Sequence, residues 1–170
     1  MKKSALTALL VLLFSMSLSA DVWDTGFKTQ SSSGIDLSWK TDKDFIYVKV
    51  SAPTEGWIAV GFGATSAMKD ANIIMGYVSG KDTVLEDQFG TGLFTHKKDT
   101  DLGGSDSIVE KSGTVKNKVT ELRFKLKLDS GDKFDVPLVP GKPVNVILSY
   151  RNDTNMTNKH SVRTKLQITL

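Results

Sequence analysis

The sequence predicts an all-β protein, built as an antiparallel sandwich of about nine or more strands. Three observations support this fold class. Apolar and polar residues alternate in most segments, and turn-forming Gly, Pro, Asn, Asp and Ser residues separate these segments at short intervals. After residue 20, no segment shows the 3.6-residue apolar spacing that is typical of a helix. Strict alternation is typical of strands that pack one face on a core.

The clearest alternation lies in residues 120–128, where Leu122, Phe124, Leu126 and Leu128 share one face and charged residues share the other. The other expected strands were identified in the same way. In chain order, the nine expected strands are 35–39, 45–50, 57–62, 72–78, 84–88, 108–115, 120–128, 144–150 and 161–170. The connection over residues 90–107 is much longer than the other turns, and long loops in compact domains are usually functional or disordered.

The first twenty residues are typical of a cleaved secretory signal peptide. Lys2 and Lys3 precede an apolar run over residues 5–14, and small residues follow up to the expected cleavage after Ser19 or Ala20. This run is shorter than the roughly 20 residues needed to span a bilayer. We therefore expect an exported protein, periplasmic or secreted and not transmembrane, with one domain over residues 21–170.

Charge and composition exclude several kinds of function. The chain has 22 Lys and Arg against 19 Asp and Glu, and removal of Lys2 and Lys3 leaves 20 against 19. So balanced a charge argues against nucleic acid or an anionic membrane as the main partner. The absence of cysteine excludes thiol catalysis, Cys-bound zinc, iron–sulfur clusters and covalently attached haem.

Catalytic motifs are also missing, and we expect that the protein is not an enzyme. His96 and His160 are the only histidines, and no G-x-S-x-G motif provides a serine nucleophile for either. The acidic residues from Asp99 to Glu110 partly match the spacing of an EF-hand calcium loop, but Gly103 stands where an oxygen ligand belongs. Since no flanking helices are evident, we interpret this segment as a solvated acidic turn.

Met68 and His160 are the two residues whose chemistry is hardest to explain by structure alone. Met68 lies in a polar loop after a glycine-rich strand, where Gly61 and Gly63 leave room for a flat group, whereas Met75 occupies an ordinary packing position within a strand. His160 lies in a polar loop that leads into the last strand. A thioether and an imidazole together suit haem iron. Core filling by Met68 and an exposed loop histidine are the alternatives.

A series of short motifs identifies the chain as similar to the DOMON domain family. The motifs extend from about Trp39 to Leu170: the strand Gly56–Gly63, residues 68–78, Asp87, His96 with Asp99, residues 102–104, 120–124 and 128–135, and finally His160, Ser161 and Arg163. The resemblance implies an immunoglobulin-like β-sandwich, in agreement with the fold class that the alternation predicts.

One branch of this family, which includes the cytochrome domain of cellobiose dehydrogenase and plant DOMON cytochromes, holds b-type haem between a methionine and a histidine. Met68 and His160 are the positions that match. A further relative, the haem subunit of ethylbenzene dehydrogenase, pairs methionine with lysine, so Lys159 is an alternative second ligand. His96 is another alternative ligand of the iron or, in the interpretation that we favour, forms a hydrogen bond within its loop. Other members of the family resemble sugar-binding modules or the domain that precedes the catalytic core of dopamine β-monooxygenase.

The resemblance implies a non-covalent haem b and a role in periplasmic electron transfer with a redox partner protein. Apolar residues of the strands would contact the macrocycle, and basic residues or the long loop would complete the site. The candidates are Trp57, Phe62 and Tyr77 for the macrocycle, Arg163, Lys159 or Arg151 for the propionates, and residues 90–107 as a cap. Plain surface charge is the alternative for the basic residues. The alternative functions are a haem-free module that binds carbohydrate or another small ligand, and a non-catalytic haem subunit of a periplasmic redox complex.

Overall fold

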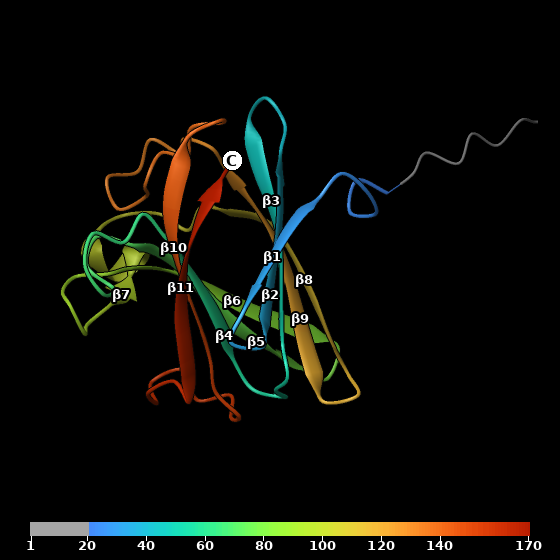
Figure 1. Ribbon diagram of the computed structural model, residues 1–170. Coiled ribbons are helices and arrows are strands. Elements are labelled where there is room, and N and C mark those ends of the chain that lie inside the picture. The colour runs from blue at the N-terminus through green and yellow to red at the C-terminus, as the bar shows by residue number, and fades with distance from the viewer. Residues whose placement is uncertain (1–20) are drawn as a thin grey trace, which may run out of the picture.

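The computed structural model describes residues 21–170, which form two antiparallel β-sheets packed face to face (Figure 1). The proposed signal peptide and its cleavage site lie outside the described residues. One sheet has five strands in the order β1 (Lys28–Ser32), β2 (Ile35–Thr41), β3 (Phe45–Ala52), β9 (Val119–Lys127) and β8 (Ile108–Lys116). The other has six, in the order β11 (Val162–Thr169), β10 (Pro143–Tyr150), β4 (Ile58–Phe62), β5 (Asn72–Ser79), β6 (Asp82–Phe89) and β7 (Lys97–Lys98).

The predicted fold class is confirmed, and each of the nine expected strands is present. Two strands were not predicted. The side chains of β1 are exposed except for a half-buried Ser32, so this edge strand has no apolar residues to alternate. The two residues of β7 are too few to form a pattern. The only helix in residues 21–170 is the short 3-10 helix η1 (Asp99–Leu102), and this part of the chain contains no helix long and apolar enough to cross a membrane.

The inner core lies between the two sheets and is filled by the inward-facing residues of both. Phe124 and Leu122 of β9 pack there with Ile46 and Val48 of β3, and each is at most 1% exposed. The alternation that predicted β9 thus reflects real burial on one face, since Glu121, Arg123 and Lys125 point away from the core.

The two central strands of the six-stranded sheet depart from this one-sided pattern. All five residues of β4 and the first five of β5 are buried. Ile58 and Val60 face the inner core, whereas Trp57 and Ala59 belong to a second apolar cluster on the outer face. We call this second group the outer cluster, and its buried members are Trp57, Ala59, Ala64, Ala71, Ile73 and Met75.

Loops cover the outer face of the six-stranded sheet and are fixed to it by backbone hydrogen bonds. In the loop after β4, the Asp70 N–H donates to the Gly90 carbonyl at 2.9 Å, and the Gly90 N–H donates to the Ala71 carbonyl at 2.9 Å. An added Cβ at Gly90 would overlap the carbonyl oxygen of Met68. Glycine at position 90 therefore allows the Met68 loop to lie directly against the end of β6.

We expect the Gly90→Ala variant to be less stable than the wild type by at least about 1–3 kcal/mol, because the backbone of the Met68 loop must move to admit a methyl group. Urea unfolding followed by tryptophan fluorescence measures the change. Gly92→Ala is the matched control, since an added Cβ there meets only the side-chain hydroxyl of Thr95. Equal destabilisation by both substitutions would contradict this account of Gly90.

Candidate functional site

A cavity of about 880 Å³ opens on the outer face of the six-stranded sheet, over the outer cluster. Its volume lies within the range of about 300–1,000 Å³ that is typical of small-molecule and cofactor sites. Strands β4, β5, β10 and β11 form the floor, and three loops form the walls. The lining residues used below are Trp57, Ala59, Gly61, Met68, Ile73, Met75, Leu93, Phe94, His96, Ile147, Met156, Lys159, His160, Arg163 and Lys165.

The floor of this outer cavity is apolar. Gly61 is paired with Ile147 of β10 on one side and with Ile73 of β5 on the other. An added Cβ at Gly61 would lie 2.7 Å from Cγ1 of Ile147 and 3.2 Å from Cγ1 of Ile73, so only glycine fits between these side chains. With Ala59 as the neighbouring outward residue, the centre of the floor has no bulky side chain of β4. Glycine at position 61 lets the side chains of Ile147 and Ile73 pack close together across β4, and a flat ligand would rest on this apolar floor.

Met68 reaches the cavity from the tight loop that follows β4. Ala67 and Asp70, on either side, have positive φ values of 50° and 63°, and Thr65 donates a hydrogen bond to Asp70 Oδ2 at 2.6 Å. The Ala71 N–H donates to the Met68 carbonyl at 3.2 Å. These contacts fix the backbone of Met68, and its half-buried side chain packs against the outer cluster.

His160 reaches the same cavity from the loop that joins β10 to β11. The loop is fixed to the start of β4, because the Trp57 N–H donates to the Asp153 carbonyl at 3.1 Å and the Trp57 indole Nε1–H donates to the Asn155 carbonyl at 3.2 Å. At its far end, the Ser161 N–H donates to the Tyr150 carbonyl at 2.9 Å. Hydrogen bonds at both ends therefore hold the segment that carries His160.

Met68 and His160 approach the cavity from opposite ends of β4. The Met68 loop follows Phe62, whereas the His160 loop follows Tyr150, which pairs with Ile58 in the antiparallel β4–β10 ladder. The fold therefore brings together two residues that are far apart in sequence and places the cavity floor between them. A thioether and an imidazole are present in one apolar cavity, which is the donor set that suits haem iron.

Both imidazoles in the cavity are held in the neutral form, which is the form that binds metal ions. Burial lowers the pKa of His160, and the charges of Arg163 and Lys159 lower it further. Burial also lowers the pKa of His96, against a small opposing effect of Glu86. Neutral imidazole nitrogens are therefore available at neutral pH.

His96 forms a hydrogen bond, as expected, but its partner lies in β6 and not in its own loop. Its Nδ1–H donates to Oε1 of the buried Gln88, and Nε2 of Gln88 donates to Glu86 at 2.8 Å. This chain of contacts orients the ring and leaves Nε2 of His96 without its proton. Because His96 also lines the cavity, it stays an alternative ligand beside Lys159.

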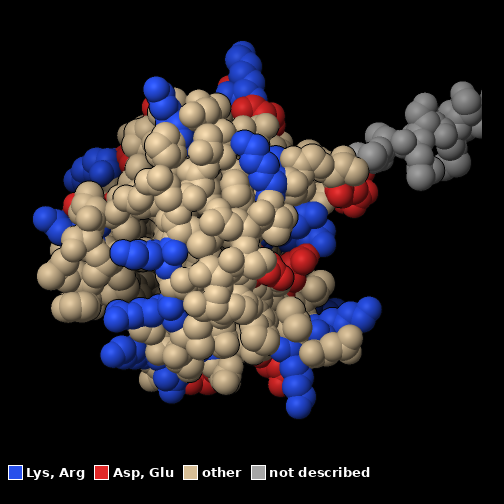
Figure 2. All heavy atoms as spheres, viewed as in Figure 1, with Lys and Arg blue, Asp and Glu red and all other residues tan. Residues whose placement is uncertain are grey.

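Basic side chains stand along one side of the cavity. Lys159, Arg163 and Lys165 all line it, and none of them forms a salt bridge with another residue in the range 21–170. In Figure 2, Lys and Arg side chains gather on the left of the molecule, in the region where Figure 1 places β11. This side of the cavity can therefore bind carboxylate groups of a ligand.

Of the other residues predicted for the site, Trp57 lines the cavity, but three do not. Phe62 faces the inner core, is 0% exposed and cannot contact a ligand on the outer face, because successive residues of a strand point to opposite faces. Tyr77 packs against the outer cluster without lining the cavity. Arg151 forms a salt bridge with Asp153 and donates to the Lys159 carbonyl at 2.7 Å. It is therefore no longer a candidate for binding a carboxylate group of the ligand.

Several lining residues were missed by the sequence analysis. Met75 was interpreted as an ordinary packing residue, but it lies on the outer face of β5 and lines the cavity, as does Met156 of the His160 loop. Leu93 and Phe94 form part of the cap expected over residues 90–107, and Phe94 is 75% exposed. The burial of β5 on both faces was the signal for Met75, since a continuous apolar run is typical of a strand covered on two sides.

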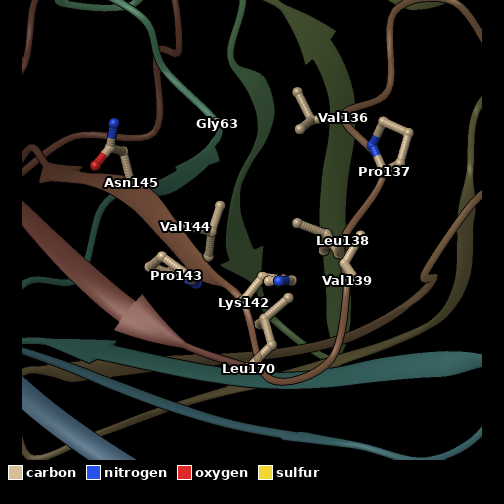
Figure 3. A pocket seen from close by; sticks show the side chains of 10 residues that line it. All are labelled: Gly63, Val136, Pro137, Leu138, Val139, Lys142, Pro143, Val144, Asn145 and Leu170. Carbon is tan, nitrogen blue, oxygen red and sulfur yellow. The ribbon is translucent and has the colours of Figure 1, made fainter.

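A second, smaller cavity of about 300 Å³ lies between the segment 136–139 and the start of β10 (Figure 3). Gly63 faces this cavity and not the outer one, and an added Cβ there would meet Val136 at 2.7 Å. The expectation that Gly63 makes room for a flat ligand is therefore wrong. Lys142 is the one charged residue in its lining, which is otherwise largely aliphatic, and the cavity has no donor set for a metal or cofactor.

Comparisons with known proteins agree with this architecture. Two solved structures are similar in fold: the cytochrome b domain of pyranose dehydrogenase from Coprinopsis cinerea, with a TM-score of 0.60 at 10% identity, and the cytochrome domain of Myriococcum thermophilum cellobiose dehydrogenase, with a TM-score of 0.55 at 13% identity. The first alignment covers 84% of this chain and 80% of the other, and the second covers 85% and 82%. At such low identity these likenesses describe the fold. No curated protein matches the sequence.

The DOMON domain family matches residues 31–151, which is more than half of the chain and includes the strands that form most of the cavity floor. The resemblance drawn from the short motifs is thus confirmed: this chain belongs to the DOMON domain family.

Proposed function

We propose that this protein binds b-type haem in the outer cavity, with Met68 and His160 as the axial ligands, and transfers electrons in the periplasm or outside the cell. The observation that carries the proposal is the convergence of a thioether and a neutral imidazole on one apolar cavity from opposite ends of β4. The likeness in fold to two cytochrome domains supports it.

The chain offers a suitable contact for each part of the proposed ligand. The apolar floor formed by Ile147 and Ile73 and the aromatic Trp57 suit the face and edge of a macrocycle. Arg163, Lys159 and Lys165 suit its two carboxylates, which otherwise would be left without a partner at the edge of an apolar cavity. Phe94 and Leu93 are exposed apolar residues that line the cavity on the side of the 90–96 loop, where they would pack against a bound macrocycle.

If Met68 and His160 both bound the haem iron, they would leave it no open coordination position, so the group would exchange electrons and would not activate oxygen. A methionine ligand favours a higher reduction potential than a second nitrogen ligand does. The protein itself would then be an electron carrier and not an enzyme, and a separate redox protein would deliver or accept the electrons. A haem subunit of a larger redox complex would use the same site.

The ligand assignment is tested by absorbance spectra of the haem-loaded protein, oxidised and reduced with dithionite. We expect a low-spin b-type spectrum for the wild type. In Met68→Leu and His160→Ala, the spectrum becomes high-spin or haem is lost, because one axial ligand is missing. Met156→Leu is the matched control, since it removes a thioether from the same cavity without removing the proposed ligand.

The same spectra separate the alternatives. A low-spin spectrum retained by His160→Ala but lost in His96→Ala or Lys159→Ala would move the second ligand to that residue. A folded wild-type protein that takes up no haem would contradict the proposal. Binding of carbohydrate or another small ligand by a haem-free module would then be the function to test.

We expect Arg163→Gln to weaken haem binding about two- to fivefold, because it removes one exposed charge beside the proposed carboxylates. The effect should shrink at high salt, where screening already weakens the interaction. Haem titration at about 0.05 and 0.5 M NaCl measures both effects. Arg123→Gln, on the five-stranded sheet, is the control. Equal affinities for the wild type and Arg163→Gln at low salt would refute this role for Arg163.

A further inference from the structure

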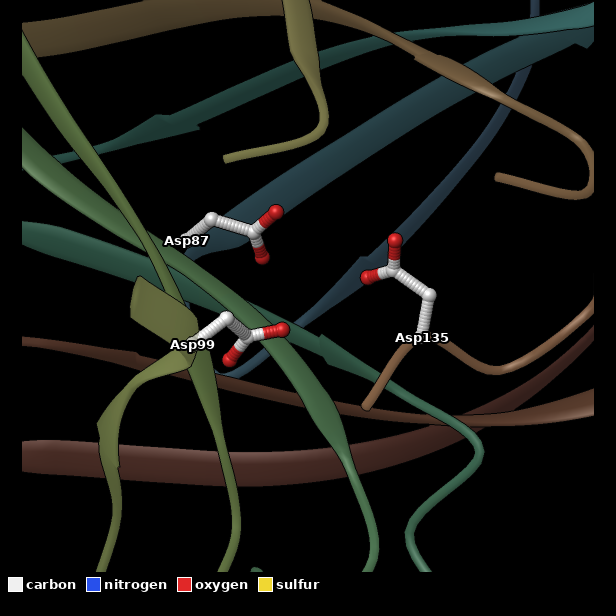
Figure 4. A group of neighbouring side chains, drawn as sticks. All are labelled: Asp87, Asp99 and Asp135. Atoms are coloured by element: carbon white, nitrogen blue, oxygen red, sulfur yellow. The ribbon is translucent and has the colours of Figure 1, made fainter. Parts of the chain in front are cut away.

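Three carboxylates from distant parts of the chain meet at the edge of the inner core, away from the outer cavity. Asp87 lies in β6, Asp99 begins η1, and Asp135 lies in the segment between β9 and β10. One oxygen of each lies within 4.8 Å of the others, and Figure 4 shows the three carboxylates pointing toward one another. Asp87 lies on the same face of β6 as Leu85, which packs in the inner core.

The carboxylate of Asp99 is completely buried and has no hydrogen-bond partner. Its residue is 0% exposed, and neither Oδ1 nor Oδ2 accepts a hydrogen bond. The interpretation of this segment as a solvated acidic turn is therefore wrong for Asp99. The EF-hand alternative also fails, since η1 is a single short turn and two of the three carboxylates lie outside residues 99–110.

The neighbours of Asp99 leave further oxygens unpaired. Asp87 is 5% exposed; its Oδ2 accepts hydrogen bonds from the N–H and the hydroxyl of Ser107 at 2.8 and 2.5 Å, but its Oδ1 accepts none. Asn72 is 5% exposed and donates to Asp135 through Nδ2, while its Oδ1 has no partner. Asp135 also accepts a hydrogen bond from the Ser130 hydroxyl at 2.5 Å.

No basic side chain neutralises this cluster. Among residues 21–170, none of the three carboxylates forms a salt bridge with Lys, Arg or His. Burial, together with a smaller effect of neighbouring carboxylates, raises the pKa of Asp99 to about 7 and that of Asp87 to about 6. A buried charge without a partner is costly, so native proteins pair such groups or bind a metal ion with them.

We propose that Asp87, Asp99 and Asp135 bind one Ca²⁺ ion, with the free Oδ1 of Asn72 as a further oxygen near the site. The donors are all oxygen atoms, which favours a hard cation over the transition metals that prefer nitrogen or sulfur. Ca²⁺–O distances of about 2.3–2.6 Å allow two ligand oxygens to be up to about 5 Å apart, whereas Mg²⁺ at about 2.1 Å allows little more than about 4 Å. The three oxygens all lie within 4.8 Å of one another, a spacing that one Ca²⁺ ion can bridge.

The ion would join three segments that backbone hydrogen bonds connect only in part. Asp99 directly follows β7, the two-residue strand that pairs Lys98 with Gln88 and Lys97 with Phe89. The loop that carries Leu93, Phe94 and His96 ends at this strand. A cation bound by Asp99 and Asp87 would therefore hold the end of the loop that caps the outer cavity, whether or not haem occupies that cavity.

Thermal unfolding of the haem-free protein, as residues 21–170, tests this proposal in EDTA and in CaCl₂. At a Ca²⁺ concentration about a hundredfold above its Kd, we expect Tm to rise by about 5–10 °C. Equilibrium dialysis with ⁴⁵Ca²⁺ is expected to find one ion per chain, and it does not depend on any variant folding. An unchanged Tm together with no bound ion would overturn the proposal, and so would stronger stabilisation by MgCl₂ than by CaCl₂.

Asp99→Asn is the informative substitution, because it removes a ligand and a buried charge at the same time. We expect this variant to lose the rise in Tm with Ca²⁺ while its Tm in EDTA at pH 7.5 is at least as high as that of the wild type. Asp101→Asn is the matched control, since Asp101 is an exposed carboxylate in the same short helix. A full Ca²⁺ response in Asp99→Asn would place the ion elsewhere and overturn the assignment.

Discussion

The burial of the six-stranded sheet on both faces is the constraint on which the rest of this structure depends. An antiparallel sandwich usually leaves the outer face of each sheet to water. Here β4 and β5 carry apolar residues on both faces, so the outer face must be covered by loops, and Met68 and His160 belong to two of the loops that cover it. The loops do not close over Gly61 and Ala59, and the outer cavity is the space that they leave.

Alternation was sufficient to predict the strands because most of them are buried on one face. It could not predict β1, whose side chains are exposed except for Ser32 and whose backbone pairs with β2. It also failed to separate the two faces of β4. In the run from Trp57 to Phe62 every residue is apolar or glycine, so the sequence does not show which positions face inward. In the structure, Phe62 faces the inner core and Gly61 faces the cavity.

The site was predictable to a different degree for each of its parts. Met68 stands out in sequence because a polar loop has no local reason to contain a methionine, and family resemblance was needed to pair it with His160. The continuous apolar run of β5 indicated that Met75 is covered, but its place in a cavity depends on which loops cover β5. The burial of Asp99 was equally hidden: its neighbours in sequence are polar, and the carboxylates that meet it come from β6 and from the segment after β9.

Strand β6 contributes to both the outer cavity and the carboxylate cluster, because its successive residues point to opposite faces of the six-stranded sheet. Gln88 points outward and orients His96 at the outer cavity, whereas Asp87, the preceding residue, points inward to the carboxylate cluster. The segment between His96 and Asp99 crosses from one face to the other in three residues, and β7 within it is paired to β6. Asp99 and His96 are therefore connected by a short segment that pairs with β6. The same strand thus contacts both the loop that caps the outer cavity and the carboxylate cluster at the edge of the inner core.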